Sequence, residues 1–168
     1  MPVTQASLNR LPGRTEPEEE STGLAHQAIG KKFPAYEYEV GREKIREYSN
    51  AVGETNPIHH DREAAQAAGF RDVVAPPMFA VVYSAGAVGP SIFDPEVGIN
   101  FAMMVHGGQE FVWGEPVCSG DVITTTNEFK DYSEKDDGKK FFVFESVSTN
   151  QDGQEVCRAT WTNIVRGG

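Results

Sequence analysis

Apolar and polar residues recur at two different spacings, which separate a helical first half of the chain from a strand-rich second half. Residues 42–52 repeat apolar side chains at helical spacing and predict an amphipathic helix that ends at Gly53. Just before it, residues 36–40 alternate aromatic or apolar side chains with glutamate and predict a short strand. After it, Asp61 is expected to cap a short helix that runs to Ala68.

Residues 73–87 form a long apolar run. Its side chains would be apolar on every side of a helix, so the predicted helix must be buried. Pro76 and Pro77 suit its first turn, because the fixed φ of proline matches helical geometry. The second half is rich in β-branched and aromatic residues and predicts strands at residues 99–105, 109–112, 122–131, 140–148 and 156–165.

Two polar segments between the predicted strands, residues 133–138 and 150–153, are typical of hairpin turns and indicate antiparallel neighbours. One apolar helix followed by a long antiparallel sheet predicts an α+β fold in which the sheet wraps around the helix. Such a sheet leaves an exposed edge strand, and we therefore expect dimerisation by edge-to-edge joining of two sheets.

Composition limits the domain organisation. Hydrophobic residues make up 39% of the 168 residues, enough for the core of one domain, which we place at residues 29–168. Residues 1–28 are rich in Pro, Gly, Ser, Thr and Glu and predict a flexible acidic tail, with a partner-binding arm as the alternative. Cys118 and Cys157 lack the paired spacing of a zinc site and are interpreted as reduced core or sheet residues.

The net charge of -10 argues against nucleic acid or an anionic membrane as a partner, since both require basic patches. A phosphate-bearing ligand would need local Arg or Lys residues to overcome this charge. The N-terminus lacks the pattern of a signal peptide, and no apolar run reaches the ~18 residues of a membrane span. A cytoplasmic protein is the simplest expectation.

The strongest chemical signal is the segment of residues 53–61, where Glu54 precedes His59 by five residues around Asn56-Pro57. A carboxylate and an imidazole held together on a loop can move protons at neutral pH. Asn56 is biased away from α geometry because it precedes proline, which helps to turn both side chains toward one cavity. The alternative is a structural role, in which backbone groups satisfy both side chains. His60 is expected to face solvent.

The order of the predicted elements and the motif residues Gly53, Asn56-Pro57-Ile58-His59 and Asp61 resemble the MaoC-like (R)-specific enoyl-CoA hydratases and (3R)-hydroxyacyl-ACP dehydratases. The resemblance covers roughly residues 33–166. The segments 75–77 and 106–111 are closer to the short actinobacterial single-hot-dog proteins, some of which support a catalytic partner. The resemblance implies a hot-dog fold.

The resemblance also implies roles for named residues. Glu54 and His59 would hold the catalytic water, with Asn56 bracing the loop, although Glu54 stands where the family usually has Asp. Pro76-Pro77 stand where His-Gly is common, and proline has no N–H to donate, so a donor for the thioester oxygen is expected from Met78 or Phe79. No metal or redox cofactor is implied, because the CoA or ACP pantetheine belongs to the substrate.

Three functions follow as hypotheses. The first is reversible hydration or dehydration of a trans-2-enoyl or (3R)-hydroxyacyl thioester, carried by CoA or ACP. The second is a non-catalytic acyl-binding or stabilising subunit, so that the chain forms either a homodimer or a heterodimer with another hot-dog subunit. The third is an acyl thioesterase, because one fold hosts several chemistries. The triplet at residues 106–108 resembles the His-Gly-Gly of hot-dog thioesterases, but it leads into a predicted strand and is interpreted as a strand-edge or interface feature.

Overall fold

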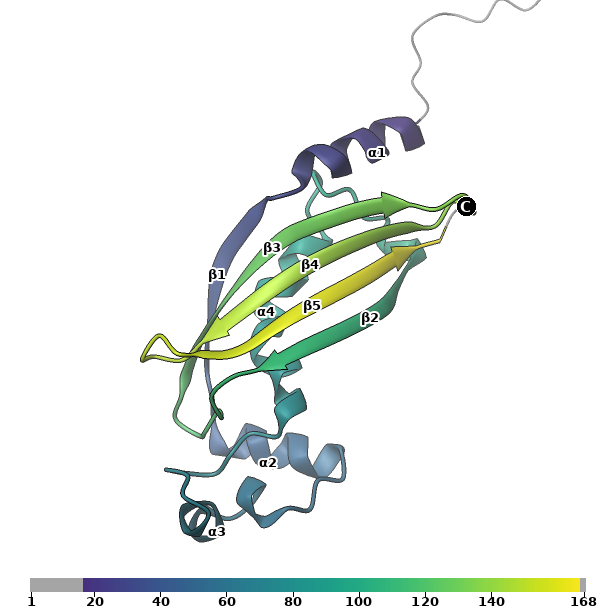
Figure 1. Ribbon diagram of the computed structural model, residues 1–168. Helices are drawn as coiled ribbons and strands as arrows, with labels where there is room; N and C mark the ends of the chain where they lie inside the picture. The colour runs from purple at the N-terminus through teal and green to yellow at the C-terminus, as the bar shows by residue number, and fades with distance from the viewer. Residues whose placement is uncertain (1–16, 167–168) are drawn as a thin grey trace, which may run out of the picture.

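The computed structural model describes residues 17–166 as an antiparallel sheet curved around one helix (Figure 1). The five strands lie in the order β1-β3-β4-β5-β2, so β1 and β2 form the two edges. The helices are α1 (Pro17–Ala28), α2 (Arg42–Ala51), α3 (Arg62–Ala67) and α4 (Ala80–Ile92), with short 3-10 turns at Pro57–His59, Pro77–Phe79 and Phe101–Met103. The strands are β1 (Lys32–Glu39), β2 (Met104–Trp113), β3 (Val122–Glu134), β4 (Lys140–Thr149) and β5 (Glu155–Val165).

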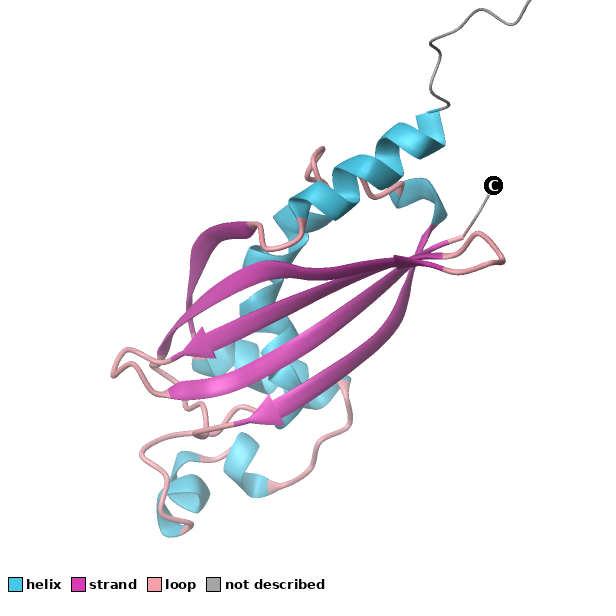
Figure 2. Cartoon of the chain, turned by 45° about the horizontal axis from the view of Figure 1, so that its top comes forward, coloured by secondary structure: helices cyan, strands magenta, loops and turns pink. Residues whose placement is uncertain are grey.

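Helix α4 lies against the concave face of the sheet, as expected for the apolar run, and Figure 2 shows the strands curving around it. Alternate residues of β3 and β4 are buried beneath the helix. The predicted fold class is therefore confirmed. The predicted helix at residues 73–87 begins later, at the turn Pro77–Phe79, because residues 73–75 are extended and pair with a neighbouring loop.

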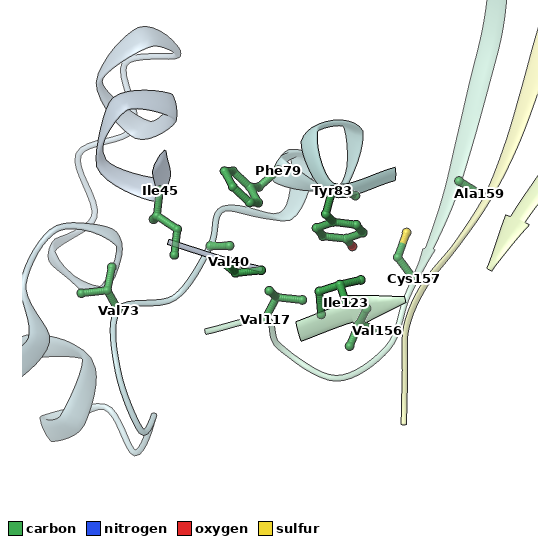
Figure 3. Packing of buried hydrophobic residues seen from close by; sticks show 12 residues of the cluster. Val40, Ile45, Val73, Phe79, Tyr83, Val117, Ile123, Val156, Cys157 and Ala159 are labelled. Atoms are coloured by element: carbon green, nitrogen blue, oxygen red, sulfur yellow. The ribbon is translucent and has the colours of Figure 1, made fainter. Parts of the chain in front are cut away.

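The buried apolar residues form two clusters at opposite ends of the sheet. Figure 3 shows the first, here called the pocket-end cluster, where α2 and the start of α4 meet the sheet. Its members are Val40, Ile45, Val73, Ala75, Phe79, Ala80, Tyr83, Val117, Ile123, Val156, Cys157 and Ala159. The second, the far-end cluster, comprises Ala25, Ala28, Phe33, Val97, Phe129, Tyr132, Phe142, Phe144 and Val165.

One predicted strand boundary is wrong. Residues 99–105 and 109–112 are not two strands, because β2 runs without a break from Met104 to Trp113 and residues 101–103 form a 3-10 turn. The pairing of β2 with β5 shifts register between His106 and Gly108. A Cβ at Gly107 would lie 2.5 Å from the side chain of Ile164, so this bulge requires glycine. Residues 106–108, which were left between two predicted strands, therefore form a bulge within one strand.

The structure also differs from the expected flexible tail. Residues 17–28 form α1, and Ala25 and Ala28 are buried in the far-end cluster, whereas residues 1–16 lie outside the described part of the chain. Small alanines give little hydrophobic periodicity, which explains why the pattern did not predict this helix. Within residues 17–166, no helix is long and apolar enough to cross a membrane.

Candidate active site

The motif loop starts from a glycine-terminated helix. Helix α2 ends in a Schellman motif, in which Gly53 has φ +71° and donates to the Asn50 carbonyl at 3.3 Å, while the Glu54 N–H donates to the Ser49 carbonyl at 2.8 Å. Asn56 has the extended conformation expected before proline, with φ −64° and ψ 124°. These local interactions fix where the loop leaves the helix.

Hydrogen bonds within the loop hold its polar side chains. The Asn56 side chain accepts from the Ile58 N–H at 3.3 Å and caps the following 3-10 turn. The Glu54 carboxylate accepts from the Asn56 N–H at 2.9 Å, and this bond is the main reason that the pKa of Glu54 lies below its usual range. His60 was expected to face solvent, but its Nε2 lies 2.6 Å from the Glu54 carbonyl oxygen. Asp61 accepts from the Ala64 N–H and caps α3, as predicted.

His59 is the buried member of the loop, with 6% of its surface exposed. Its Nδ1 lies 2.7 Å from the carbonyl oxygen of Val74. A carbonyl oxygen can only accept, so Nδ1 carries a proton in this bond, and the neutral ring presents Nε2 as an acceptor. The local geometry therefore selects the tautomer that can take a proton at Nε2.

His59 lines a pocket of about 370 Å³ beside the start of α4. Two segments form its opposite walls, one at Ile58-His59 and the other running from Trp113, the last residue of β2, to Val117. Tyr83, Val117 and Val156 are buried residues of the lining, and Figure 3 shows them close together. The lining residues are Ile58, His59, Phe70, Val74, Ala75, Pro76, Pro77, Tyr83, Trp113, Gly114, Glu115, Pro116, Val117 and Val156.

A three-residue extended segment connects the two walls. The Val74 N–H donates to the Ile58 carbonyl at 3.0 Å, and the Ala75 N–H donates to the Val117 carbonyl at 2.8 Å. On the outer side, the Gly114 N–H donates to the Val156 carbonyl at 3.0 Å. The width of the pocket is thus set by backbone hydrogen bonds between segments far apart in the sequence.

Comparison with known proteins places this arrangement in a family. Residues 27–159 match the protein family described as "FAS1-like, dehydratase domain region". The chain belongs to this FAS1-like dehydratase family. It is 41% identical over 145 residues to a UPF0336 protein of Saccharopolyspora erythraea, a match that covers 86% of this chain and 92% of the relative.

Solved structures agree with the family assignment. The HadBC (3R-hydroxyacyl-ACP dehydratase) complex of Mycobacterium tuberculosis contains a chain that is 29% identical, with a TM-score of 0.70 and coverage of 82% of this chain and 96% of that one. A MaoC-like dehydratase is 25% identical with a TM-score of 0.76, covering 86% of this chain and 44% of that one. The expected relation to MaoC-like hot-dog hydratases and dehydratases is confirmed.

Within this FAS1-like dehydratase domain, the two residues of the predicted acid/base pair have different environments. His59 lines the pocket, whereas Glu54 is half-buried at the loop's other end and is not among the lining residues. Glu54 still interacts electrostatically with His59. The carboxylate that does line the pocket is Glu115, on the opposite wall. Glu115 lies in no recognisable motif, so only the turn signal of Gly114 and Pro116 marked its surroundings in the sequence.

The two expected oxyanion donors also differ. The Phe79 N–H donates to the Pro76 carbonyl at 2.8 Å, and the Phe79 side chain is fully buried in the pocket-end cluster. Met78 is 47% exposed, and its N–H lies in a first helical turn, where amide groups lack intrahelical acceptors. Pro76 and Pro77, rather than Met78 or Phe79, meet the pocket. Of these two residues, only Met78 remains a predicted donor to the thioester oxygen, through its backbone N–H.

Proposed function

We propose that this domain catalyses the reversible hydration of a trans-2-enoyl thioester to a (3R)-hydroxyacyl thioester, carried by CoA or ACP. The observation that carries the proposal is His59, whose Nε2 is an acceptor in an apolar pocket because Nδ1 is bound to the Val74 carbonyl. In hydration, Nε2 takes a proton from water as the water oxygen bonds to C3, and the protonated Nε2 then gives this proton to C2, which restores the neutral ring. Dehydration runs through the same steps in reverse.

Glu54 is proposed to assist water activation through His59. Its carboxylate is kept ionised by the Asn56 N–H and interacts electrostatically with the imidazole. A negative charge near the ring favours the imidazolium that forms when Nε2 takes a proton. The negative charge developing on the thioester oxygen needs a donor, and the proposed one is the Met78 N–H, which belongs to the peptide bond that follows the pocket-lining Pro77.

Three variants test this assignment with crotonyl-CoA as substrate. His59→Gln keeps a hydrogen-bonding side chain but removes the base, and we expect the hydration rate to fall by about 10² to 10⁴. Glu54→Gln removes the charge alone and should give a smaller loss, concentrated in kcat. Glu115→Gln removes the carboxylate of the opposite wall and is the matched comparison. Activity unaffected by His59→Gln would refute the site.

A second candidate function is a non-catalytic acyl-binding or stabilising subunit. It is favoured by the position of Glu54 outside the pocket lining and by the engaged Phe79 N–H. The similar HadBC dehydratase is a complex of subunits. In this chain β2 is an edge strand on which Val112 and Trp113 are exposed, so a second subunit could pair there. If this candidate is correct, the purified chain alone will be inactive and activity will require another hot-dog subunit.

Thioesterase activity is the third alternative and has weaker support. The triplet His106-Gly107-Gly108 lies in the edge strand β2 and does not line the pocket. Release of free thiol from an acyl-CoA in the absence of enoyl turnover would favour it over the hydro-lyase.

A further inference from the structure

Tyr83 is the most deeply buried aromatic residue of the pocket lining. It projects from α4 toward β5, with its ring near Cys157 (Figure 3), and only 3% of its surface is exposed. Its hydroxyl interacts with the Cys157 thiol, on the strand beneath the helix. Trp113 and Glu115, on the outer part of the lining, are exposed. A ligand with its reacting carbons beside His59 therefore directs its tail toward Tyr83 and its carrier outward.

The strand register shows what lies beyond Tyr83. Thr125, Ser148 and Cys157 are paired across β3, β4 and β5, and the Cys157 contact places this row beneath Tyr83. Two residues further along, Asn127, Ser146 and Ala159 form the next row.

This next row lies beneath the following turn of α4. The Asn127 amide lies 3.5 Å from the Ala87 carbonyl, and Ala87 is four residues after Tyr83. Two residues of a strand advance about 6.6 Å and four residues of a helix about 6 Å, so one row corresponds to one turn.

Apart from Asn127, whose amide donates to the Ser91 hydroxyl at 2.9 Å, the side chains beyond Tyr83 are small. Ala87 on the helix and Ser146 and Ala159 on the sheet are all buried and small. The row after them is bulky, because Phe129, Phe144 and Trp161 are paired across the same strands. The Trp161 Nε1 donates to the Ser146 hydroxyl at 2.8 Å. The side chains therefore change from small to large about one helical turn beyond the tyrosine.

We propose that Tyr83, positioned by Cys157, limits the length of the acyl chain, so that the site selects short-chain acyl thioesters. The proposal rests on the proposed function for the class of ligand. A smaller residue at position 83 would extend the pocket by about one row, roughly 6 Å. An extension of roughly 6 Å holds about four more carbons, because an extended alkyl chain advances by less than one C–C bond length per carbon.

Binding of unreactive saturated ligands tests the proposal without requiring catalysis. We would measure the Kd of butyryl-CoA and octanoyl-CoA by titration calorimetry for the wild type, Tyr83→Leu and Tyr83→Phe. An unobstructed pocket would gain roughly fourfold in affinity for each extra buried methylene. We expect the wild type to bind octanoyl-CoA no more tightly than butyryl-CoA. Tyr83→Leu should shift the ratio of the two Kd values at least tenfold toward octanoyl-CoA.

Three further variants separate size selection from general loosening. Tyr83→Phe retains the ring and should keep most of the wild-type ratio. Cys157→Ala removes the hydroxyl's partner and should shift the ratio in the same direction as Tyr83→Leu but less. Phe142→Leu weakens the far-end cluster and should leave the ratio unchanged, which controls for lost stability.

Several results would overturn the proposal. These are tighter wild-type binding of octanoyl-CoA, an unchanged ratio in Tyr83→Leu, or no measurable binding of either ligand at millimolar concentration. A failure of the proposed function can be told apart from a failure of the size limit. In that case the Kd values of butyryl-CoA and octanoyl-CoA would follow the expected pattern, but crotonyl-CoA would not be hydrated. Conversely, equal turnover of crotonyl-CoA and trans-2-octenoyl-CoA by the wild type would support the function and refute the size limit.

Discussion

Aromatic rings pack at both ends of the sheet, but the pocket end also holds a cavity. At the far end, aromatic rings pack directly on one another, with centroids of Phe129 and Phe144 5.0 Å apart and those of Tyr132 and Phe142 also 5.0 Å apart. Helix α1 covers this end. At the pocket end, short helices and extended segments are joined by backbone hydrogen bonds, and a cavity remains between them.

This difference indicates a division of roles along one sheet. Burial of large rings contributes stability in proportion to apolar area, without requiring open space. A binding pocket gives up part of that burial and needs its walls held by other means, here by backbone bonds through Val74 and Ala75. We infer that the far end stabilises the fold while the pocket end positions the site.

The largest expected effect comes from truncating a far-end ring. Phe142→Ala removes a side chain that is 2% exposed, and we expect the free energy of unfolding to fall by about 3–5 kcal/mol. Urea denaturation would measure the loss, with Phe142→Leu as a milder step in the same series. Because the ring lies outside the pocket-end cluster, the Kd for butyryl-CoA under native conditions should not change. A parallel loss of affinity would show that the two ends are not separable.

The sequence predicted the parts of the site that depend on neighbouring residues. The end of α2 at Gly53, the extended Asn56 and the Asp61 cap all follow from hydrogen bonds within a few positions. By contrast, the meeting of His59, Tyr83 and Glu115 around one pocket depends on pairing between segments separated by tens of residues.

The fold shows the same limit of prediction. Strand-rich segments and the apolar helix were recognisable from their own residues, and the fold class is confirmed. The bulge at Gly107 could not be predicted, and one strand was predicted as two, because the cause of the bulge, the side chain of Ile164, lies on another strand. Helix α1 was missed because its buried contacts come from two alanines, Ala25 and Ala28.

A glycine in the pocket wall offers the next test. A Cβ at Gly114 would lie 2.0 Å from the Glu155 carbonyl oxygen, so Gly114→Ala must push the wall away from β5. We expect a loss of about 1–3 kcal/mol in the free energy of unfolding. We also expect about a tenfold weaker Kd for butyryl-CoA, measured by calorimetry. Gly108→Ala is the matched control, because an added Cβ there meets nothing within 4 Å. Equal behaviour of the two variants would contradict the role of the wall.

A smaller effect on stability is expected from the cap of the motif loop. Asn56→Ala removes the acceptor for the Ile58 N–H and should cost about 1 kcal/mol in thermal or urea unfolding. Asn100→Ala is the control, since Asn100 precedes a 3-10 turn without making a side-chain cap bond. If Asn56 positions His59, its substitution should also lower kcat for crotonyl-CoA, whereas Asn100→Ala should not. Equal kcat values would limit Asn56 to a stabilising role.

The smallest effect concerns an ion pair at the far end. Burial opposes ionisation of Asp94, but the Lys31 ammonium at 2.9 Å and the N–H groups of Glu96 and Val97 outweigh it and lower the pKa of Asp94. A pKa lower in the folded than in the unfolded state adds stability above about pH 4, and this stability disappears as the pH falls through the folded pKa.

Asp94→Asn should therefore cost less than about 1 kcal/mol at pH 7, as is usual for a partly exposed ion pair. The difference from the wild type should shrink as the pH falls below about pH 4 and vanish below the folded pKa of Asp94, where both proteins lack the charge. Urea unfolding of the two proteins between pH 3 and pH 7 would measure this, with Asp152→Asn in an exposed turn as the control. A difference that stays constant over this range would mean that hydrogen-bond geometry, rather than charge, links Asp94 to the fold. The far end would then depend on packing alone, which would sharpen its contrast with the charged loop of the pocket end.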